Sequence, residues 1–319
     1  MNTVIHDSLL GLAVADALGV PVEFKYRSEL AEDPVTGVRA FGTYNQPAGT
    51  WSDDSSLTFC LADSLCSGYD LVDIAMKFVA WRNAEIWTPH GSVFDIGMTT
   101  HRSIGVLDEI LKSDDHDSLQ LLHYEADEYT NGNGSLMRIL PLYFAIKDKA
   151  LDEQFRLIWE VSALTHPHIR SALACFLYLR IYHYLVDEKN KEHAFQQGLI
   201  DFRSLLEERE IATAEREHFS RILDPQFSAL PKSEIASDGY VIHSLEASLW
   251  CLLRHDNYEQ TILEAINLGE DTDTTAAIVG GLAGALYGKD GIPLPWQEAL
   301  VKKAEILALC DRFAKVYLH

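Results

Sequence analysis

The sequence predicts an all-α fold in which residues 1–319 form a single domain. Apolar residues recur at helical spacing along most of the chain, and strand-like alternation is scarce. A length of 319 residues would also allow two domains of about 150 residues each. The chain contains no clear linker, internal repeat or low-complexity segment, and this favours one domain.

The N-terminal half begins with a helix expected over residues 3–19, whose apolar residues share one face. Residues 31–50 are rich in glycine and proline and predict a long loop. Ser52 is expected to cap a helix that continues to about Ser67. Glycine and proline interrupt residues 85–97. Further helices are expected over 70–81, 98–112 and 115–126, and from about residue 136 onward, after a loop at 131–135.

The C-terminal half is also predicted to be helical. Residues 151–185 should form two helices, separated at Thr165–Pro167. The charged segment 187–235 is interpreted as surface helix or connector, because its apolar residues keep helical spacing. The last expected elements are helices over 241–254 and 258–267, a loop at 269–273, a glycine-rich helix ending near residue 288, and a helix over 296–317.

The net charge is strongly negative and restricts the possible ligands. The chain has 26 basic and 48 acidic residues, which give a formal net charge of −22. No basic stripe relieves this charge locally, so nucleic acid and anionic lipid surfaces are not expected partners. An anionic small ligand would need bound cations or the N–H groups of helix N-termini to be held.

Cysteine usage indicates a reducing compartment, and we expect a cytoplasmic protein. The cysteines number five, and none forms a C-x-x-C pair, which favours buried free thiols. The N-terminal residues lack a basic start followed by an apolar run, so no signal peptide is expected. The most apolar stretch, Thr274–Gly288, is too short to span a bilayer, so no membrane association is expected.

Asp53 and Asp54 form the first of two acidic clusters. Both are expected in the first turn of a helix. Adjacent helical residues diverge by about 100°, so two such carboxylates can share one volume only at a helix end. The alternative role is plain capping, since acidic side chains stabilise a helix N-terminus.

The second cluster lies in the segment Gly269–Thr274. Asp271 and Asp273 alternate on an expected loop, so an extended backbone would point both carboxylates the same way, and Thr274 would start the next helix. The glycines of that helix would permit close approach of another helix and hold the loop rigidly. Capping or a structural calcium loop is the alternative, although the EF-hand spacing is missing.

Together the two clusters suggest a metal site made of hard oxygen ligands. Four carboxylates and the neighbouring hydroxyls suit Mg²⁺, Mn²⁺ or Ca²⁺, and no His or Cys spacing suggests zinc. Two divalent ions about 3.5–4 Å apart can orient a substrate and activate a water molecule. The sequence therefore favours metal-assisted hydrolysis.

Further residues could complete such a site. The glycine loop Asn131–Ser135 precedes an expected helix and could place backbone N–H groups against a phosphate, or be an ordinary turn. Glu23 follows a helix end in an apolar stretch. Burial there would raise its pKa and suit it to general-base work, whereas a surface Glu23 would have no such role. Asp95 has a similar status, and His166 is either a ligand contact or a structural polar residue.

Six motifs, in order along the chain, resemble the ADP-ribosylglycohydrolase family nearly from end to end. They are Asp16–Glu23 (DALGVPVE), Gly49–Ser55 (GTWSDDS), Phe94–Thr100 (FDIGMTT), Asn131–Arg138 (NGNGSLMR), Leu164–His166 (LTH) and Gly269–Ala277 (GEDTDTTAA). The Phe94–Thr100 motif is similar to the bacterial branch of dinitrogenase-reductase-activating glycohydrolase and ADP-ribosylarginine hydrolase.

The resemblance implies an orthogonal multi-helix domain with a central metal-binding cleft. It also implies a magnesium-dependent hydrolase that cleaves the bond between ADP-ribose and an acceptor side chain, with arginine as the expected acceptor. The implied cofactors are two Mg²⁺ ions, with Mn²⁺ as a substitute. The implied metal ligands are Ser52, Asp53, Asp54, Asp271, Asp273 and Thr274.

The remaining site residues are also carried over from the family motifs. Glu23 and Asp95 match catalytic positions. The positions expected to contact ADP-ribose are Asn133, Gly134, Ser135 and His166. Glycosidic cleavage passes through an oxocarbenium-like state, so a water deprotonated by Glu23 or Asp95 would attack the anomeric carbon.

The chain departs from the family pattern at three positions. Ser52 stands where the family usually has threonine; its hydroxyl can still coordinate, with more rotamer freedom. Ala15 and Glu270 replace usual glycines, and Glu270 adds a charge beside the expected metal loop. None of these changes removes a carboxylate, so activity is expected.

Two other functions compete with hydrolysis. The first is a non-catalytic family member, meaning an ADP-ribose-binding, crystallin-like or toxin-immunity protein. The second is an isoprenoid synthase, but Asp53–Leu57 lacks the distal Asp of D-D-x-x-D. The expected partner is an ADP-ribosylated protein or a small ADP-ribosyl conjugate, and a monomer is slightly favoured.

Overall fold

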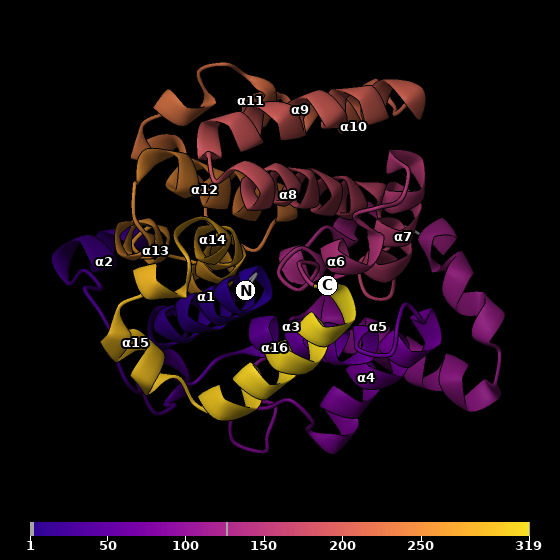
Figure 1. Cartoon of the computed structure of the whole chain (residues 1–319), viewed down its shortest axis with the longest axis horizontal. Helices are drawn as coiled ribbons and strands as arrows, with labels where there is room; N and C mark the ends of the chain where they lie inside the picture. Colours follow the sequence, from indigo (N-terminus) through magenta and orange to yellow (C-terminus); the bar gives the residue numbers. More distant parts are fainter. Residues whose placement is uncertain (1–2, 126, 319) are drawn as a thin grey trace.

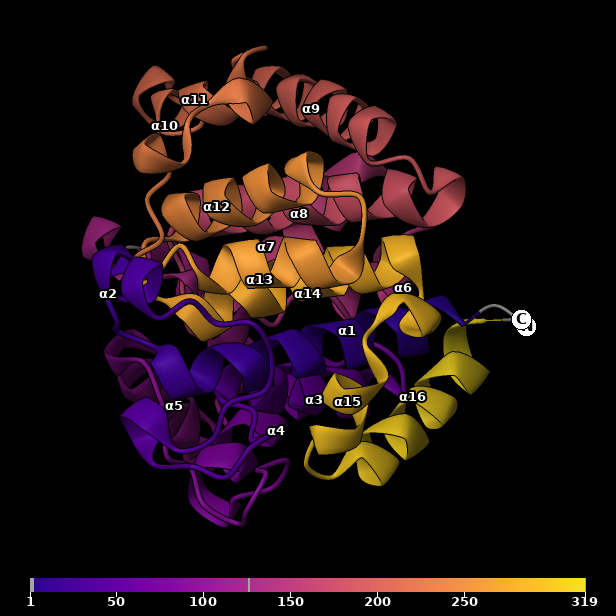
Figure 2. The ribbon, with the colours of Figure 1, turned by 90° about the vertical axis from the view of Figure 1, so that its left-hand side faces the viewer.

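The computed structural model describes residues 3–125 and 127–318 and confirms the all-α prediction. The described residues contain no β-strand, and their extended pairing is confined to two isolated bridges, Phe41–Gln46 and Gly132–Tyr240. The helices are stacked in layers, with α9 at one edge, α8 and α12 beneath it, then α13 and α14, then α1, and α3 and α4 on the far side of α1 (Figures 1 and 2).

The α-helices, in chain order, are α1 Val4–Gly19, α2 Arg27–Glu32, α3 Asp53–Leu65, α4 Leu71–Ala84, α5 Met98–Ser113, α6 Leu142–Ile146, α7 Leu151–Ala163, α8 Ile169–Glu188, α9 Lys191–Glu208, α10 Thr213–Glu217, α11 Ser220–Leu223, α12 Val241–Arg254, α13 Tyr258–Ile266, α14 Thr272–Tyr287, α15 Leu294–Ala299 and α16 Lys303–Tyr317. Short 3₁₀ helices connect them: η1 Val20–Val22, η2 Gly42–Tyr44, η3 His116–Glu125, η4 Glu128–Thr130, η5 Asn133–Ser135, η6 Phe227–Ala229, η7 Lys232–Glu234 and η8 Lys289–Gly291.

Three expected helices differ from the structure. No helix starts at Leu136; turns continue to α6, because Pro141 has no N–H to donate and biases the residue before it away from helical angles. The segment predicted over 115–126 is the 3₁₀ helix η3, and residue 126 lies outside the described residues. The C-terminal helix predicted over 296–317 is divided into α15 and α16, where Lys302 adopts a left-handed φ of 56°.

The central helix α1 packs very closely against α14, as the glycines of α14 predicted. A Cβ added to Gly11 would lie 2.5 Å from the carbonyl oxygen of Gly280. A Cβ added to Gly284 would clash with the carbonyl of Asp7, and one added to Gly19 would clash with the backbone of Asp273. This backbone-to-backbone contact sets the end of α1 beside the N-terminus of α14, where the second acidic cluster lies.

The segment Val4–Val22, formed by α1 and η1, is long and apolar enough to cross a membrane by composition alone. However, 94% of its apolar window is buried inside the protein. Figure 2 shows α1 enclosed between α14 on one side and α3 on the other. The apolar character of this segment is therefore accounted for by its position in the core.

Candidate active site

A cavity of about 500 Å³ lies where the N-terminal ends of α3, α5 and α14 approach η5. Its lining includes eight of the residues predicted for the site: Glu23, Asp53, Asp95, Asn133, Gly134, His166, Asp271 and Thr274. The other predicted residues, Ser52, Asp54, Ser135 and Asp273, are buried next to this lining. The structure therefore brings together residues from three separate stretches of the chain, 23–54, 95–166 and 271–274.

The first cluster lies at the start of α3, as predicted. Ser52 is the N-cap, and its hydroxyl accepts a hydrogen bond from the Asp54 amide at 3.3 Å and donates to Asp54 Oδ2 at 3.0 Å. The Thr274 hydroxyl also donates to Asp54 Oδ2, at 3.2 Å. This last contact joins the two acidic clusters directly, across 220 residues of sequence.

The second cluster does not lie on an extended loop, and that part of the prediction is wrong. Helix α14 begins at Thr272, so Asp271 is its N-cap residue and Asp273 lies in its first turn. The two carboxylates converge because a helix N-terminus is a place where neighbouring side chains can share one volume. The predicted helix start at Thr274 was late because Asp273 belongs to the helix.

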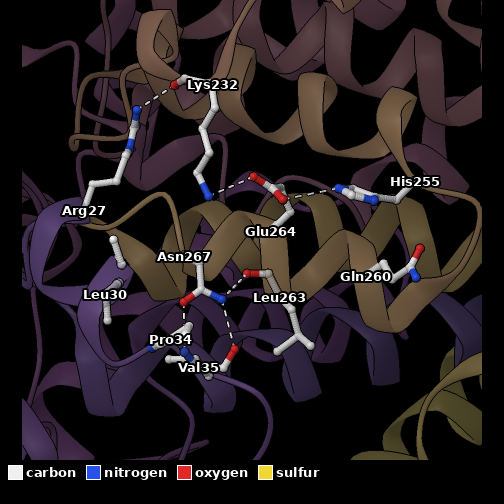
Figure 3. Close-up of a pocket in the computed structure, with 11 residues that line it drawn as sticks. Arg27, Leu30, Pro34, Val35, Lys232, His255, Gln260, Leu263, Glu264 and Asn267 are labelled. Carbon is white, nitrogen blue, oxygen red and sulfur yellow. Dashed lines mark hydrogen bonds and ion pairs between the residues drawn. The ribbon is translucent and has the colours of Figure 1, made fainter.

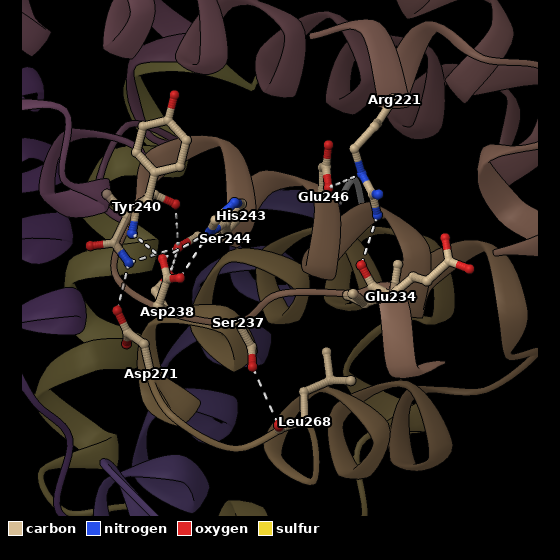
Figure 4. Close-up of polar contacts among 12 residues, drawn as sticks. Arg221, Glu234, Ser237, Asp238, Tyr240, His243, Ser244, Glu246, Leu268 and Asp271 are labelled. Carbon is tan, nitrogen blue, oxygen red and sulfur yellow. Dashed lines mark hydrogen bonds and ion pairs between the residues drawn. The ribbon is translucent and has the colours of Figure 1, made fainter. Parts of the chain in front are cut away.

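Asp271 is held in place by the segment 237–244, which Figure 4 shows around it. Its amide donates to the Ser237 carbonyl at 3.0 Å. The Asp271 Oδ2 atom accepts a hydrogen bond from the side-chain amide of Asn133, Nδ2, at 2.7 Å. The Nδ2 group of Asn133 also donates to Ser244 Oγ, at 2.8 Å. Asn133, predicted to contact ADP-ribose, therefore also orients a predicted metal ligand, in the way that outer partners of metal sites do.

The residues present fit hard divalent cations. Within the described part of the chain, Glu23 Oε2, Asp54 Oδ1, Asp271 Oδ1 and Asp273 Oδ2 are buried and have no hydrogen-bond partner. Leaving buried carboxylate oxygens unpaired is costly, and a cation would satisfy them. Two sets, Asp16–Asp54–Asp273 and Glu23–Asp271–Asp273, each bring one oxygen per residue within 4.8 Å of the others. Asp273 belongs to both sets, so the two sites would be adjacent.

The carboxylates of the site also perturb one another. Burial, followed by repulsion from Asp95, raises the pKa of Asp53 well above its usual value. Burial and the charge of Asp95 raise the pKa of Glu23 to about 9, and burial raises the pKa of Asp95 to about 6. These shifts have a common cause: several carboxylates share one buried volume. A bound cation would reverse them.

The residues predicted to contact ADP-ribose are only partly exposed to the cavity. Gly134 lies against His166, and a Cβ added to it would be 2.7 Å from Cε1 of that ring, so glycine is needed here for packing. Burial lowers the pKa of His166 to about 3, and its Nδ1 pairs with the Thr165 hydroxyl at 2.8 Å. Ser135 accepts a hydrogen bond from Ser162 at 2.9 Å, and its side chain faces the core.

Two residues of the site were missed from the sequence. Asp16, fully buried on α1, accepts hydrogen bonds from the amides of Ser52, at 3.0 and 3.1 Å, and Ser55, at 3.1 Å, and from the Ser55 hydroxyl at 2.5 Å. Asp16 is the one carboxylate in the apolar run of residues 9–22, and this was the available signal. Tyr44 lies near Glu23 and Asp95 and influences the pKa of both carboxyl groups. It belongs to a segment predicted as a loop, where no sequence signal marked it.

A larger cavity, of about 740 Å³, lies elsewhere, between α2, α13 and η7 (Figure 3). Its charged side chains already have partners. Arg27 donates to the carbonyls of Leu268, Lys232 and Ile235, and Lys232 is paired with Glu264 at 2.9 Å. It contains none of the predicted site residues, so size alone does not identify the reactive cavity.

Comparison with known proteins gives consistent matches over nearly the whole chain. The model of the family described as ADP-ribosylglycohydrolase matches residues 4–319. The ADP-ribosylarginine hydrolase Tri1 of Serratia proteamaculans (strain 568) is 32% identical over 309 residues, which cover 96% of this chain and 77% of that protein. The ADP-ribosyl-dinitrogen reductase glycohydrolase of Rhodospirillum rubrum is 28% identical over 312 residues, covering 94% and 92%.

A solved structure described as an ADP-ribosylglycohydrolase-related protein complex is similar in fold. It superposes with a TM-score of 0.79 and 27% sequence identity, and the alignment covers 99% of both chains. The match therefore includes the helices that carry both acidic clusters.

Proposed function

This chain belongs to the ADP-ribosylglycohydrolase family, and on that basis we propose that it hydrolyses the glycosidic bond between ADP-ribose and an acceptor side chain with the help of magnesium. The observation that carries the proposal is the set of four buried, unpaired carboxylate oxygens beside a cavity lined by Glu23 and Asp95. We also propose that residues 1–319 act as one domain, because the termini of the described chain meet where α16 packs on α1 and α3.

Arginine is the proposed acceptor. Two relatives are named for ADP-ribosylarginine and for ADP-ribosylated dinitrogen reductase. The cavity supports this choice, because a cationic guanidinium would meet Glu23, Asp53 and Asp95 on its lining. Charge-assisted hydrogen bonds between a guanidinium and carboxylates are among the strong polar interactions in proteins. The proposed partner is an ADP-ribosylated protein or a small ADP-ribosyl conjugate.

We propose two Mg²⁺ ions as cofactors, with Mn²⁺ as a substitute. The residues proposed to hold them, by match to the family motifs, are Ser52, Asp53, Asp54, Asp271, Asp273 and Thr274. Of these, Asp54, Asp271 and Asp273 belong to the two sets of neighbouring oxygens. When bound, such ions supply Lewis acidity and orient hydroxyl groups of the substrate. They would also neutralise part of the local negative charge, which an ADP-ribose anion requires in a protein of net charge −22.

The chain's own groups would do the remaining work. Glu23 and Asp95 both line the cavity, and either carboxylate can accept the proton of an attacking water. His166 is neutral because burial lowers its pKa, so it would act towards the substrate as a hydrogen-bonding group and not as a cation. Asn133 would keep Asp271 in position through its 2.7 Å hydrogen bond.

The test is hydrolysis of ADP-ribosyl-arginine by the purified chain, with Mg²⁺ and with EDTA. We expect release of ADP-ribose with Mg²⁺ and its loss with EDTA. Asp54→Asn should abolish metal-dependent turnover, because Asp54 Oδ1 is one of the unpaired oxygens. Asp63→Asn, at a carboxylate paired with Lys77 and Arg312 on the surface side of α3, is the control. Tight binding of intact substrate without cleavage would support the non-catalytic alternative.

A further inference from the structure

We propose that Tyr44 is a positioning residue that joins the two candidate acids, Glu23 and Asp95, into one unit through its hydroxyl group. This inference rests on the proposed function, because it assigns a role within the same site. It concerns a residue that none of the six family motifs contains.

The backbone around Tyr44 is fixed by contacts to the segment that carries Glu23. The Phe41 amide donates to the Gln46 carbonyl at 2.6 Å and closes the turn. Gly42 has a left-handed φ of 67°, and a Cβ there would clash with the carbonyl of Pro21. The Thr43 hydroxyl donates to the Glu23 carbonyl at 2.7 Å. These contacts fix the position of Tyr44 beside Glu23.

The ring of Tyr44 spans the two segments that carry the acids. It packs against Phe24, with ring centroids 6.3 Å apart, and against Phe94, with centroids 5.2 Å apart at an interplanar angle of 62°. Phe24 directly follows Glu23, and Phe94 directly precedes Asp95. The contact with Phe94 is edge-on, a geometry that is favourable between aromatic rings and helps to define the ring orientation.

The hydroxyl of Tyr44 completes the connection, because it lies near the carboxyl groups of both Glu23 and Asp95 and would donate a hydrogen bond to either of them. A phenol has one proton, so it donates to one carboxylate at a time. Burial and the surrounding negative charges raise the pKa of Tyr44, which keeps the phenol protonated as a donor. Both Glu23 and Asp95 line the cavity, so Tyr44 would act on the substrate through them.

The experiment compares Tyr44→Phe, which keeps the ring and removes the hydroxyl, with the wild type. With ADP-ribosyl-arginine and Mg²⁺, we expect kcat to fall roughly tenfold and KM to stay within about twofold, since the acids lose their shared partner while the binding residues remain. In hydrogen–deuterium exchange, segments 22–25 and 92–97 should both exchange faster in the variant, whether or not substrate is present.

Tyr69→Phe is the matched control, because the Tyr69 hydroxyl donates to Glu160 at 2.9 Å in a similar tyrosine–carboxylate pair outside the cavity lining. It should leave kcat and the exchange of both segments unchanged. Wild-type exchange in both segments, or wild-type kcat, for Tyr44→Phe would overturn the proposal. If the wild-type chain cleaved no ADP-ribosyl linkage, the proposed function would fail, and the exchange result would still decide the role of Tyr44.

Discussion

Asp16 is a buried carboxylate whose two oxygens accept four hydrogen bonds from Ser52 and Ser55. These residues flank Asp53 and Asp54, so Asp16 sets the conformation of the turn that presents two predicted metal ligands. Its proximity to Asp54 and Asp273 would also allow direct coordination of a metal. We favour the first role, because the donors of the turn already occupy both oxygens.

Asp16→Asn should lower Mg²⁺ affinity by about 10- to 100-fold while the number of bound ions stays the same, as expected when a group behind the ligands is lost. The Asn side chain would present an NH₂ group to donors that need an acceptor. Isothermal titration of the wild type, Asp16→Asn and the control Asp63→Asn measures both quantities. Loss of one bound ion would instead identify Asp16 as a ligand.

Glu270 occupies a position where the backbone favours glycine, with φ of 63°. Its carbonyl accepts from the Phe24 amide at 2.7 Å and its amide donates to the Lys25 carbonyl at 2.7 Å, so this conformation is fixed by its neighbours. The left-handed region costs a non-glycine residue about 1–2 kcal/mol. A glutamate in place of glycine at position 270 therefore lowers the stability of the folded backbone next to the predicted metal ligands.

Glu270→Gly should raise the free energy of unfolding by up to about 1 kcal/mol, because relief of backbone strain exceeds the entropy that glycine gains on unfolding. Glu270→Gln removes the charge and keeps the strained conformation, so it separates the two effects. Urea denaturation of the three proteins in EDTA gives the comparison. Equal stabilisation by both variants would show that charge, and not φ, is responsible.

At the scale of elements, the contact between α1 and α14 places the site. Close packing through Gly11, Gly280 and Gly284 brings the backbones of these helices together. The C-terminal end of α1, with Asp16, then lies beside the N-terminal end of α14, with Asp273. Helix α3 adds Asp54 through its contact with Thr274. The site is therefore an intersection of helix ends, and a shift of α14 would separate its carboxylates.

Gly284→Ala should lower the free energy of unfolding by about 1–3 kcal/mol through overpacking, because the new methyl group would meet the backbone of Asp7. Gly105→Ala is the matched control within helix α5: its methyl would meet only the end of the flexible Arg82 side chain, at 3.3 Å. It should stabilise the protein by up to about 1 kcal/mol. Thermal unfolding measures both, and tolerance of Gly284→Ala would contradict the packing argument.

At the scale of the whole molecule, part of the net charge of −22 comes from the carboxylates of the cavity, where the carboxyl pKa values are raised. A carboxyl group whose pKa is higher in the folded state contributes stability that is present below its unfolded pKa and is lost as pH rises through the folded pKa. For Asp95 that loss ends near pH 6, and for Glu23 near pH 9. Metal-free protein thus loses this contribution from about pH 4 upward.

Mg²⁺ should therefore stabilise the protein more at pH 8 than at pH 5, because the ion competes with protons for the same oxygens. The measurement is the difference in melting temperature between samples with Mg²⁺ and with EDTA at each pH. Surface ion pairs are present in both samples, so their pH dependence cancels in this difference. The difference should grow across the range from pH 5 to pH 8 in the wild type and largely disappear in Asp54→Asn. A difference independent of pH would argue against metal binding at these carboxylates.

The sequence by itself determined the elements whose signals are local. Ser52 as the cap of α3, the helix predicted over 70–81 and the break at Thr165–Pro167 are all confirmed, because capping and helical periodicity depend on residues within a few positions of one another. The family and its glycohydrolase activity class were also evident from the six motifs and are confirmed by the comparisons. The roles of the individual site residues, the two Mg²⁺ ions, the arginine acceptor and the cytoplasmic location stay predictions.

Only the tertiary structure decided how the site residues meet. Asn133 contacts Asp271, Ser135 faces the core, and Asp16 accepts hydrogen bonds from the turn that carries Asp53 and Asp54. These contacts join residues that are far apart in sequence. Helical periodicity defines which face of a helix is buried. It does not define which helix end approaches which, because that depends on the close packing of α1 on α14. The aspartate clusters were therefore visible in the sequence, and their convergence became visible in the fold.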